Sequence, residues 1–194
     1  MFFRQIIESK LSQYAYLIGC QHTREAVIVD PQRDIDRYLE IAAANNLRIV
    51  AAAETHIHAD YLSGLREFAG RCGVKILISD EGGSAWRYEW LLNSAFDRLL
   101  LKHGDSFVMG AVKLEAVHTP GHTPEHLSFL VYDRSADEST PMGILSGDFV
   151  FVGDVGRPDL METAVGSKGV MVPAARQLFH SLSLFKNLPP FLQL

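Results

Sequence analysis

The sequence predicts an α/β (α+β) fold in which two mixed β-sheets pack face to face with helices on the outside, a four-layer arrangement. Three observations support this prediction. Short apolar or alternating runs, which are typical of strands, recur along most of the chain. A few segments between and after these runs instead carry apolar residues at helical spacing. The length of 194 residues suits one domain, so we expect residues 1–194 to form a single domain.

The N-terminal part is predicted to supply most of one sheet. Residues 14–20 and 26–30 are apolar, β-rich runs separated by a polar turn, which predicts a hairpin. Residues 34–45 have helical spacing and end in an asparagine, which predicts a helix. Residues 48–53 form an apolar run typical of a buried strand, and residues 64–72 predict a short helix behind it.

The middle of the chain continues this sheet and then begins a second set of strands. Residues 75–79 predict another strand, followed by an aromatic cluster of Trp86, Tyr88 and Trp90. We expect these aromatic residues to be local core rather than the wall of a substrate cavity. The second set of strands is predicted at residues 98–102, 106–109, 113–118, 127–132 and 143–146, and a last helix at residues 172–184.

Composition excludes several classes of protein. With 47% hydrophobic and 21% charged residues, the chain is typical of a soluble globular protein. The net charge is −5 and the basic residues are scattered, so we expect no nucleic-acid partner. No apolar run is long enough for a membrane span, and we expect no membrane partner. The spacing of Cys20 and Cys72 favours two buried or half-buried free thiols, and with them a cytoplasmic location.

A cluster of metal-binding residue types follows the predicted strand 48–53. Residues 55–60 read Thr-His-Ile-His-Ala-Asp. On an extended or tightly turning backbone, the alternation directs His56, His58 and Asp60 to one side. Imidazole and carboxylate groups are preferred ligands of zinc and iron. The sequence therefore predicts a metal site at this strand end.

Two later segments have the residues to complete such a site. Residues 118–123 read His-Thr-Pro-Gly-His-Thr, and within this turn His122 is the better ligand because it follows the glycine. His118 still belongs to the preceding strand, and a histidine on the sheet face is the favoured interpretation for it. His126 could support the site from the next strand. Asp148 ends a Ser-Gly-Asp segment after another predicted strand.

In this order, the three segments resemble the metallo-β-lactamase superfamily, and the resemblance covers nearly the whole chain. It implies the αββα sandwich of that superfamily, in agreement with the predicted elements. Residues 146–148 and 153–160, the latter reading Gly-Asp-Val-Gly-Arg-Pro-Asp-Leu, most resemble the persulfide dioxygenases. The first three residues and residues 26–31 resemble the bacterial members of this branch that are associated with rhodanese domains.

The dinuclear zinc hydrolases of the superfamily imply two metals. The first would be held by residues matching His56, His58 and His122. The second would need Asp60, a histidine directly after it and a histidine near the C-terminus, with the match of Asp148 bridging the two metals.

This chain departs from that pattern at two positions. The residue after Asp60 is Tyr61, whose phenol stays protonated at neutral pH and is a poor ligand. No histidine follows His180, which lies in the predicted last helix rather than in a glycine-flanked loop. The second metal has therefore lost two ligands, and we expect one metal per chain.

The resemblance implies which metal this is. In a persulfide dioxygenase it would be one Fe²⁺ held by His56, His122 and Asp148, with His58 and Asp60 beside it or serving as alternative ligands. Two imidazoles and a carboxylate on one face leave coordination positions open. Zn²⁺ is the alternative, but it cannot change its oxidation state and could not serve an oxidation.

The implied activity is the oxidation of a thiol persulfide of low molecular weight, for example glutathione persulfide, by O₂ to sulfite and thiol, in sulfide detoxification. Arg157, Asp159 and Tyr61 are the candidate catalytic residues. Arg157 could attract an anionic substrate, although a surface ion pair with Asp159 explains the same two residues. A rhodanese acting in trans is a candidate partner, and the apolar C-terminal residues favour a homo-oligomer.

Two other functions remain open from the sequence. The first is a zinc-dependent thiolester hydrolase similar to glyoxalase II, which Tyr61 and the missing distal histidine disfavour. The second is an inactive, truncated protein of the same fold. Members of the family continue beyond the segment that matches residues 188–194, so we expect this domain to be incomplete at its C-terminus and to lack its last strands.

Overall fold

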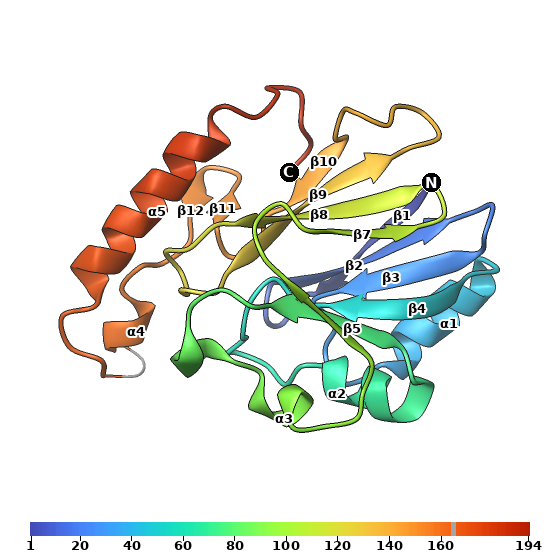
Figure 1. Ribbon diagram of the computed structural model, residues 1–194, viewed down its shortest axis with the longest axis horizontal. Coiled ribbons are helices and arrows are strands. Elements are labelled where there is room, and N and C mark those ends of the chain that lie inside the picture. The colour runs from blue at the N-terminus through green and yellow to red at the C-terminus, as the bar shows by residue number, and fades with distance from the viewer. Residues whose placement is uncertain (164–165) are drawn as a thin grey trace.

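Two β-sheets face each other in the computed structural model, which describes residues 1–163 and 166–194 (Figure 1). The first sheet has six strands in the order β1-β2-β3-β4-β5-β6, and the second has four in the order β10-β9-β8-β7. Helices α1, α2 and α3 lie along the first sheet, and α5 lies beside the second (Figure 1). The predicted four-layer arrangement is confirmed.

The first sheet changes from antiparallel to parallel pairing along its order. Its strands are β1 (Phe2–Glu8), β2 (Gln13–Cys20), β3 (Glu25–Val29), β4 (Arg48–Ala53), β5 (Lys75–Ser79) and β6 (Arg98–Leu101). Strands β1 to β3 pair antiparallel, which confirms the predicted hairpin, whereas β3 to β6 pair parallel. Parallel strands are covered on both faces, which explains the nearly continuous apolar runs of β4 and β5.

Two parts of this sheet differ from the prediction. Strand β1 was not predicted, because it is an edge strand that is mostly exposed or half-buried and lacks a clear apolar period. The prediction placed residues 98–102 in the second set of strands, and this was wrong. Strand β6 pairs with β5, with Leu99 opposite Leu77, because the long connection between them returns the chain to the first sheet in parallel orientation.

The second sheet is antiparallel throughout. It contains β7 (Ser106–Met109), β8 (Val112–His118), β9 (Leu127–Asp133) and β10 (Gly143–Leu145). A small hairpin of β11 (Val150–Phe151) and β12 (Asp154–Val155) follows, and it was not predicted. Strands of two residues give too short a period to detect in a sequence.

Three helical segments agree with the prediction to within a few residues, whereas the short helices α3 and α4 were not predicted. They are α1 (Asp36–Ala44), α2 (Leu65–Glu67), α3 (Glu89–Leu92), α4 (Leu160–Thr163) and α5 (Met171–Phe185). Helix α2 continues as a π-helical turn over Phe68–Cys72, so the predicted helix at residues 64–72 is present in two parts. A single 3₁₀ turn covers Ser84–Trp86.

Apolar side chains fill the space between the sheets. Val27, Ala51 and Leu77 from the first sheet belong to one buried cluster with Leu114 and Phe129 from the second. Burial of apolar surface is the main stabilising term in folding, so this layer holds the two sheets together. The strand ends of both sheets are thereby fixed relative to one another.

The C-terminal segment lies against the second sheet. Leu188 and Leu192 pack against the cluster of Leu130, Tyr132 and Ile144, and Gln193 forms an isolated parallel bridge with Gly143 at the β10 edge. Phe191 is 63% exposed. Cys20 is buried and Cys72 is exposed, and both are free thiols, so the expectation of burial fails for Cys72.

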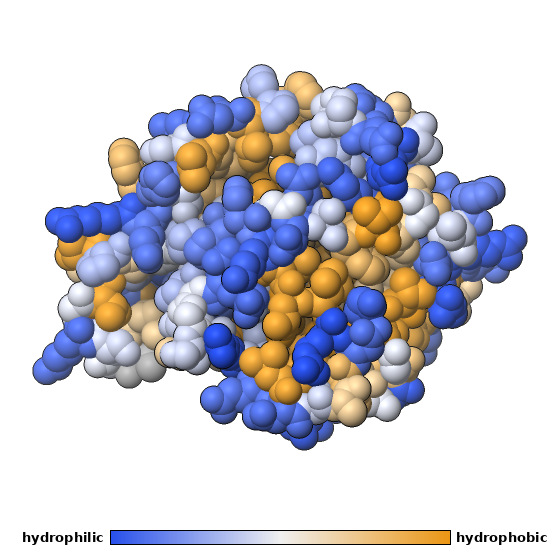
Figure 2. Space-filling view, in the orientation of Figure 1, coloured by the Kyte–Doolittle hydropathy of each residue, from blue (hydrophilic) through white to orange (hydrophobic). Residues whose placement is uncertain are grey.

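Surface apolar residues on the face shown in Figure 2 occur as separate patches among hydrophilic ones. Across the described residues, 1–163 and 166–194, we find no helix with the length and apolar character needed to cross a membrane.

Candidate metal centre

Three strand ends bring the predicted ligands together. His56 follows β4, His122 lies in the turn between β8 and β9, and Asp148 follows β10. One ligand atom from each of these residues lies within 4.8 Å of the others. His122 Nε2 is 3.4 Å from Asp148 Oδ2. The first sheet thus supplies one imidazole, and the second sheet supplies the other imidazole and the carboxylate.

The chemical state of these side chains suits a divalent metal ion. Burial lowers the pKa of His56 well below its ordinary value, and the neighbouring histidines His58, His126 and His122 lower it further. Burial also lowers the pKa of His122, although Asp148 opposes this. A metal ion binds imidazole through an unprotonated nitrogen, so two neutral rings beside a carboxylate fit such an ion.

A hydrogen-bond chain fixes which nitrogen of His56 faces the cluster. The Thr55 hydroxyl donates to Asp30 Oδ2 at 2.9 Å, so its oxygen accepts from His56 Nδ1 at 2.9 Å. The Thr55 backbone N–H also donates to Asp30 Oδ1, at 2.7 Å. His56 therefore carries its hydrogen on Nδ1, which leaves the lone pair of Nε2 available to a metal ion.

The other two residues of the His-x-His-x-Asp segment lie outside this cluster. The rings of His56 and His58 are adjacent, with centroids 4.1 Å apart, but His58 Nε2 lies 3.1 Å from Asp30 Oδ1. Burial acts to lower the pKa of His58, but Asp30 and other nearby carboxylates raise it to about 9. The Asp60 side chain is 60% exposed. His58 Nδ1 also lies 4.0 Å from Asp60 Oδ1, so the three side chains lie side by side, and His58 and Asp60 border the ligand cluster rather than belong to it.

Tyr61 lies beside His58 rather than beside the cluster. Its ring centroid is 4.4 Å from that of His58, and its hydroxyl donates to the backbone oxygen of Asp30 at 3.3 Å. The same oxygen accepts from Gln13 Nε2 at 2.8 Å. Burial raises the pKa of Tyr61, which keeps the phenol neutral and agrees with its assignment as a poor ligand.

Arg157 and Asp159 form a two-point ion pair with each other. Arg157 Nε donates to Asp159 Oδ1 at 3.1 Å, and Arg157 Nη2 donates to Asp159 Oδ2 at 2.6 Å. The Arg157 side chain is 64% exposed. The surface ion pair considered from the sequence is present, and a catalytic role of the two residues stays a prediction.

Neighbouring histidines and a glutamate support the turn of His122 and the loop of His56. His118 Nε2 donates to the backbone oxygen of Pro124 at 2.8 Å and so closes the turn. His126 is fully buried, and its Nε2 accepts from the Asp148 backbone N–H at 3.1 Å. Glu125 Oε1 accepts from the backbone N–H of Ile57, the residue between the two histidines, at 2.8 Å.

The sequence analysis missed Asp30, Thr55 and Glu125 as supporting residues. Asp30 directly follows β3, and the parallel pairing of β3 with β4 brings the two strand ends close together; the sequence shows the end of the strand but not this pairing. Glu125 follows the predicted turn directly, but its contact with Ile57 depends on the docking of the two sheets.

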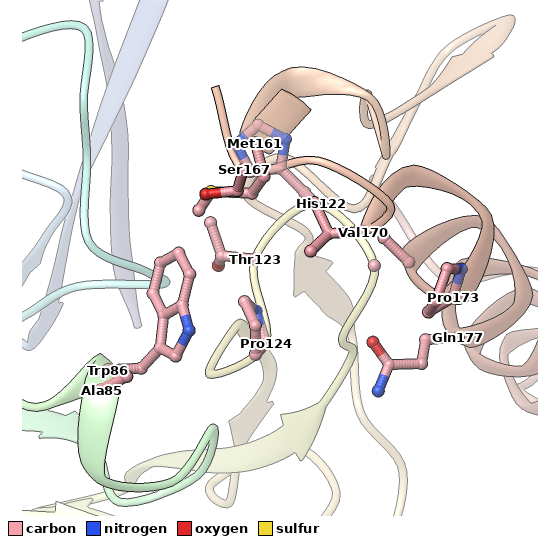
Figure 3. Close-up of a pocket in the computed structure, with 12 residues that line it drawn as sticks. Ala85, Trp86, His122, Thr123, Pro124, Met161, Ser167, Val170, Pro173 and Gln177 are labelled. Atoms are coloured by element: carbon pink, nitrogen blue, oxygen red, sulfur yellow. The ribbon is translucent and has the colours of Figure 1, made fainter. Parts of the chain in front are cut away.

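Two cavities open onto the ligand cluster. A cavity of about 580 Å³ is lined by His122, Thr123 and Pro124 together with Trp86 and residues of α5. In Figure 3, Trp86 and the α5 residues Pro173 and Gln177 lie on opposite sides of the loop that carries Thr123 and Pro124. Trp86 therefore lines a cavity, contrary to the expectation of local core, whereas Tyr88 is buried in the core as expected.

The second cavity lies on the Asp148 side of the cluster. Its volume is about 510 Å³, and its lining includes Asp148, His58, Asp60, Tyr61 and Gln13. Its lining is more polar than that of the first cavity, which is bounded mainly by proline, alanine, valine, methionine and tryptophan side chains. The two cavities thus border the ligand cluster at different residues, His122 in the first and Asp148 in the second.

Two facing sheets with helices outside, and a cluster of two imidazoles and a carboxylate at their strand ends, define a candidate metalloenzyme of the αββα type. The chain belongs to the Metallo-beta-lactamase superfamily, whose sequence model matches residues 9–191.

Curated relatives point to more than one activity within this family. The bovine (Bos taurus) protein "Persulfide dioxygenase ETHE1, mitochondrial" is 31% identical over 167 residues, covering 82% of this chain and 56% of the relative. The human (Homo sapiens) "Hydroxyacylglutathione hydrolase-like protein" is 30% identical over 178 residues, covering 91% of this chain and 52% of the relative. The chain therefore spans little more than half the length of these relatives. Their similarity supports the interpretation that the chain belongs to an enzyme.

Solved structures agree with the fold. A metallo-beta-lactamase from Staphylococcus aureus subsp. aureus COL is 46% identical with a TM-score of 0.91, covering 98% of this chain and 54% of that one. ETHE1 from Myxococcus xanthus is 28% identical with a TM-score of 0.73, covering 96% of this chain and 71% of that one.

Proposed function

We propose that this protein is an iron-dependent persulfide dioxygenase, which oxidises a thiol persulfide of low molecular weight with O₂ and water to sulfite and thiol. The observation that carries the proposal is the cluster of His56, His122 and Asp148, with His58 bound to Asp30 and a tyrosine at the position after Asp60. Two imidazoles and one carboxylate form the ligand set of mononuclear non-haem iron oxygenases. The similarity to ETHE1 persulfide dioxygenases supports the same reaction.

One Fe²⁺ would be held by His56, His122 and Asp148. When bound, ferrous iron supplies a redox-active centre with open coordination positions for sulfur and dioxygen. The protein's own contribution is to keep the ligand groups in the correct state. Thr55 and Asp30 keep the hydrogen of His56 on Nδ1, and Asp30 holds the neighbouring His58 through its Nε2 atom.

The cavities would divide the access to this centre. We propose that the polar cavity with Tyr61 and Gln13 binds the thiol carrier, because their amide and hydroxyl groups can hydrogen-bond a peptide-like molecule. The more apolar cavity beside Trp86 and Pro124 borders the opposite side of the cluster, at His122.

A zinc-dependent thiolester hydrolase is the second candidate. It is favoured by one observation, the 30% identity to the human hydroxyacylglutathione hydrolase-like protein. Against it, the neutral phenol of Tyr61 takes the place of a second-metal ligand.

Metal analysis of protein purified without oxygen separates the two candidates. We expect about one iron per chain, and oxygen uptake with release of sulfite when glutathione persulfide is added. The matched assay uses a glutathione thiolester and follows release of the free thiol. Two zinc ions per chain, together with thiolester hydrolysis and no oxygen uptake, would replace the proposal with the hydrolase.

A further inference from the structure

We infer that His126 is a positioning residue that fixes the carboxylate ligand Asp148 relative to His56, with its Nε2 atom as a hydrogen-bond acceptor. The inference rests on the metal-binding part of the proposed function, and not on the identity of the substrate. From the sequence, His126 was expected only to support the metal site in some way. Its contacts in the structure define a specific role.

The hydrogen bonds of His126 fix its tautomer. The Asp148 backbone N–H donates to His126 Nε2 at 3.1 Å, so this nitrogen carries a lone pair. The hydrogen of the neutral ring is therefore on Nδ1, which donates to Thr119 Oγ1 at 2.8 Å. A ring with its hydrogen on Nε2 would place two N–H groups against each other at Asp148.

The chain of donors continues from Thr119 and returns to the Asp148 segment. With its oxygen accepting from His126, the Thr119 hydroxyl donates to Ser128 Oγ at 2.9 Å. The Ser128 hydroxyl then donates to the backbone oxygen of Ser146 at 3.3 Å. The Ser-Gly-Asp segment is thus held at both ends, at Ser146 by its carbonyl and at Asp148 by its amide.

Packing brings His126 against the other ligand segments as well. Its fully buried ring stacks on His56, with centroids 5.0 Å apart and an interplanar angle of 25°. Gly147 adopts a φ of +53°, and a Cβ at this position would lie 2.7 Å from His126 Nε2. The backbone next to Asp148 therefore approaches the ring more closely than a side chain would permit. His126 also belongs to the loop that carries His122.

These contacts predict a selective effect on metal binding. A buried histidine with a purely structural role would affect folding stability, with no separate effect of the two ring nitrogens on metal affinity. A residue that orients a metal-binding side chain typically contributes 10-fold to 100-fold in metal affinity. The two nitrogens of His126 have different partners, so their contributions can be separated.

Two amide substitutions separate them. In His126→Gln, the side-chain oxygen has about the reach of Nε2 and can still accept from the Asp148 N–H. In His126→Asn, the shorter amide has the reach of Nδ1 and can still meet Thr119, but it leaves the Asp148 N–H without its acceptor. Both variants are polar amides in the same buried place, so each is the control for the other.

The experiment measures affinity for Fe²⁺, and separately for Zn²⁺, by competition with a chromogenic chelator in the absence of oxygen. We expect His126→Asn to weaken binding of both ions at least 10-fold, and His126→Gln to stay within about 3-fold of the unchanged protein. Hydrogen exchange of the Asp148 amide should be faster in His126→Asn and nearly unchanged in His126→Gln. Equal affinities for the two variants would overturn the inference.

Two further variants keep the test valid if His126→Asn folds poorly. Val112→Ala removes buried side-chain volume at the start of β8, away from the ligand cluster, and should lower the melting temperature with metal affinity unchanged. Thr119→Val removes the hydroxyl that receives Nδ1–H and should weaken metal binding more than Val112→Ala does. The reverse order of these two affinities would also overturn the inference. The measurements of metal affinity and hydrogen exchange use no persulfide. If the protein failed to oxidise persulfide, the role of His126 would therefore be unaffected, and only the proposed reaction would be contradicted.

Discussion

Asp30 fixes the orientation of two adjacent histidines, His56 and His58. Its carboxylate accepts from the Thr55 backbone, from the Thr55 hydroxyl and from His58. Through Thr55 it leaves His56 with a free Nε2, and by direct contact it occupies Nε2 of His58. The two histidines of a regular alternation therefore differ in which nitrogen stays free, Nε2 in His56 and Nδ1 in His58.

Removal of the turn histidine should abolish metal binding. In His122→Ala only two of the three ligands remain. We therefore expect this variant to bind less than a tenth of the metal bound by the unchanged protein. The matched variant is His118→Ala, which lies in the same turn and loses only its bond to Pro124. Elemental analysis of both variants after anaerobic loading measures the effect. Normal metal content in His122→Ala would contradict the assignment of this ligand.

Tyr61 offers a second test at this scale. In Tyr61→Phe the hydroxyl bonded to the Asp30 backbone oxygen is lost, while Gln13 still donates to that oxygen. We expect unchanged metal content and a loss of about 1 kcal/mol in the free energy of unfolding, measured with urea. A fall in kcat of more than 10-fold at unchanged metal content would give the hydroxyl a part in the reaction, as the sequence analysis expects.

The sequence could place His56, His122 and Asp148 among the candidate ligands, because each stands in a short motif after an apolar strand, and the resemblance to persulfide dioxygenases singled out these three, which the structure brings together. It could not identify the partner of His58. Asp30 is 28 residues away in the chain and reaches His58 only because β3 and β4 pair in parallel. Such contacts follow from pairing between strands, which local residue patterns do not encode.

Strand ends and tight loops carry the ligands at the scale of elements. The turn after β8 is held by α5: the Ser181 hydroxyl donates to the Pro120 backbone oxygen at 2.9 Å. A Cβ on Gly121 would lie 2.7 Å from the Cα of Leu178 in α5, so the turn and the helix touch through backbone atoms. The prediction of α5 was correct, but its periodicity does not reveal that it docks on this turn.

Glycine in the loop after β10 should matter far more than glycine in the hairpin that follows. Gly147→Ala adds a Cβ 2.6 Å from Thr55 Oγ1 at a residue with positive φ. We expect a loss of at least about 2 kcal/mol in stability together with weaker metal binding. Gly153→Ala has positive φ but open space around the added atom, so only the backbone strain of about 1 kcal/mol applies.

Urea unfolding and chelator competition on these two glycine variants provide the measurement. Equal effects of the two substitutions on metal binding would show that close approach to Thr55 and His126 is not required.

At the scale of the whole molecule, the layer between the sheets holds the site in place. Phe129 is fully buried there, and Phe129→Ala should reduce the free energy of unfolding by about 3–5 kcal/mol. Phe179, on α5, is 72% exposed, and Phe179→Ala should change stability by less than about 0.5 kcal/mol. Thermal unfolding of the two variants tests this difference. Similar melting temperatures would contradict the proposed position of the core.

The four-layer architecture was predictable because most strands and the three longer helical segments have clear periodicity. The sheet to which each strand belongs was less predictable. Strand β6 has the same apolar character as the strands of the second sheet, and only its pairing with β5 assigns it to the first. Strand β1 lies at an edge, where polar residues on both faces hide the period.

The ligand atoms come from both halves of the sandwich, with positions as far apart as 56 and 148. A growing polypeptide on the ribosome cannot complete this pocket until its second half has emerged and docked. Loading with metal is therefore expected to come late in biogenesis. Once bound, an ion would connect the two halves through its ligands. At a free concentration 100 times its Kd, it would raise the free energy of unfolding by about 2.7 kcal/mol.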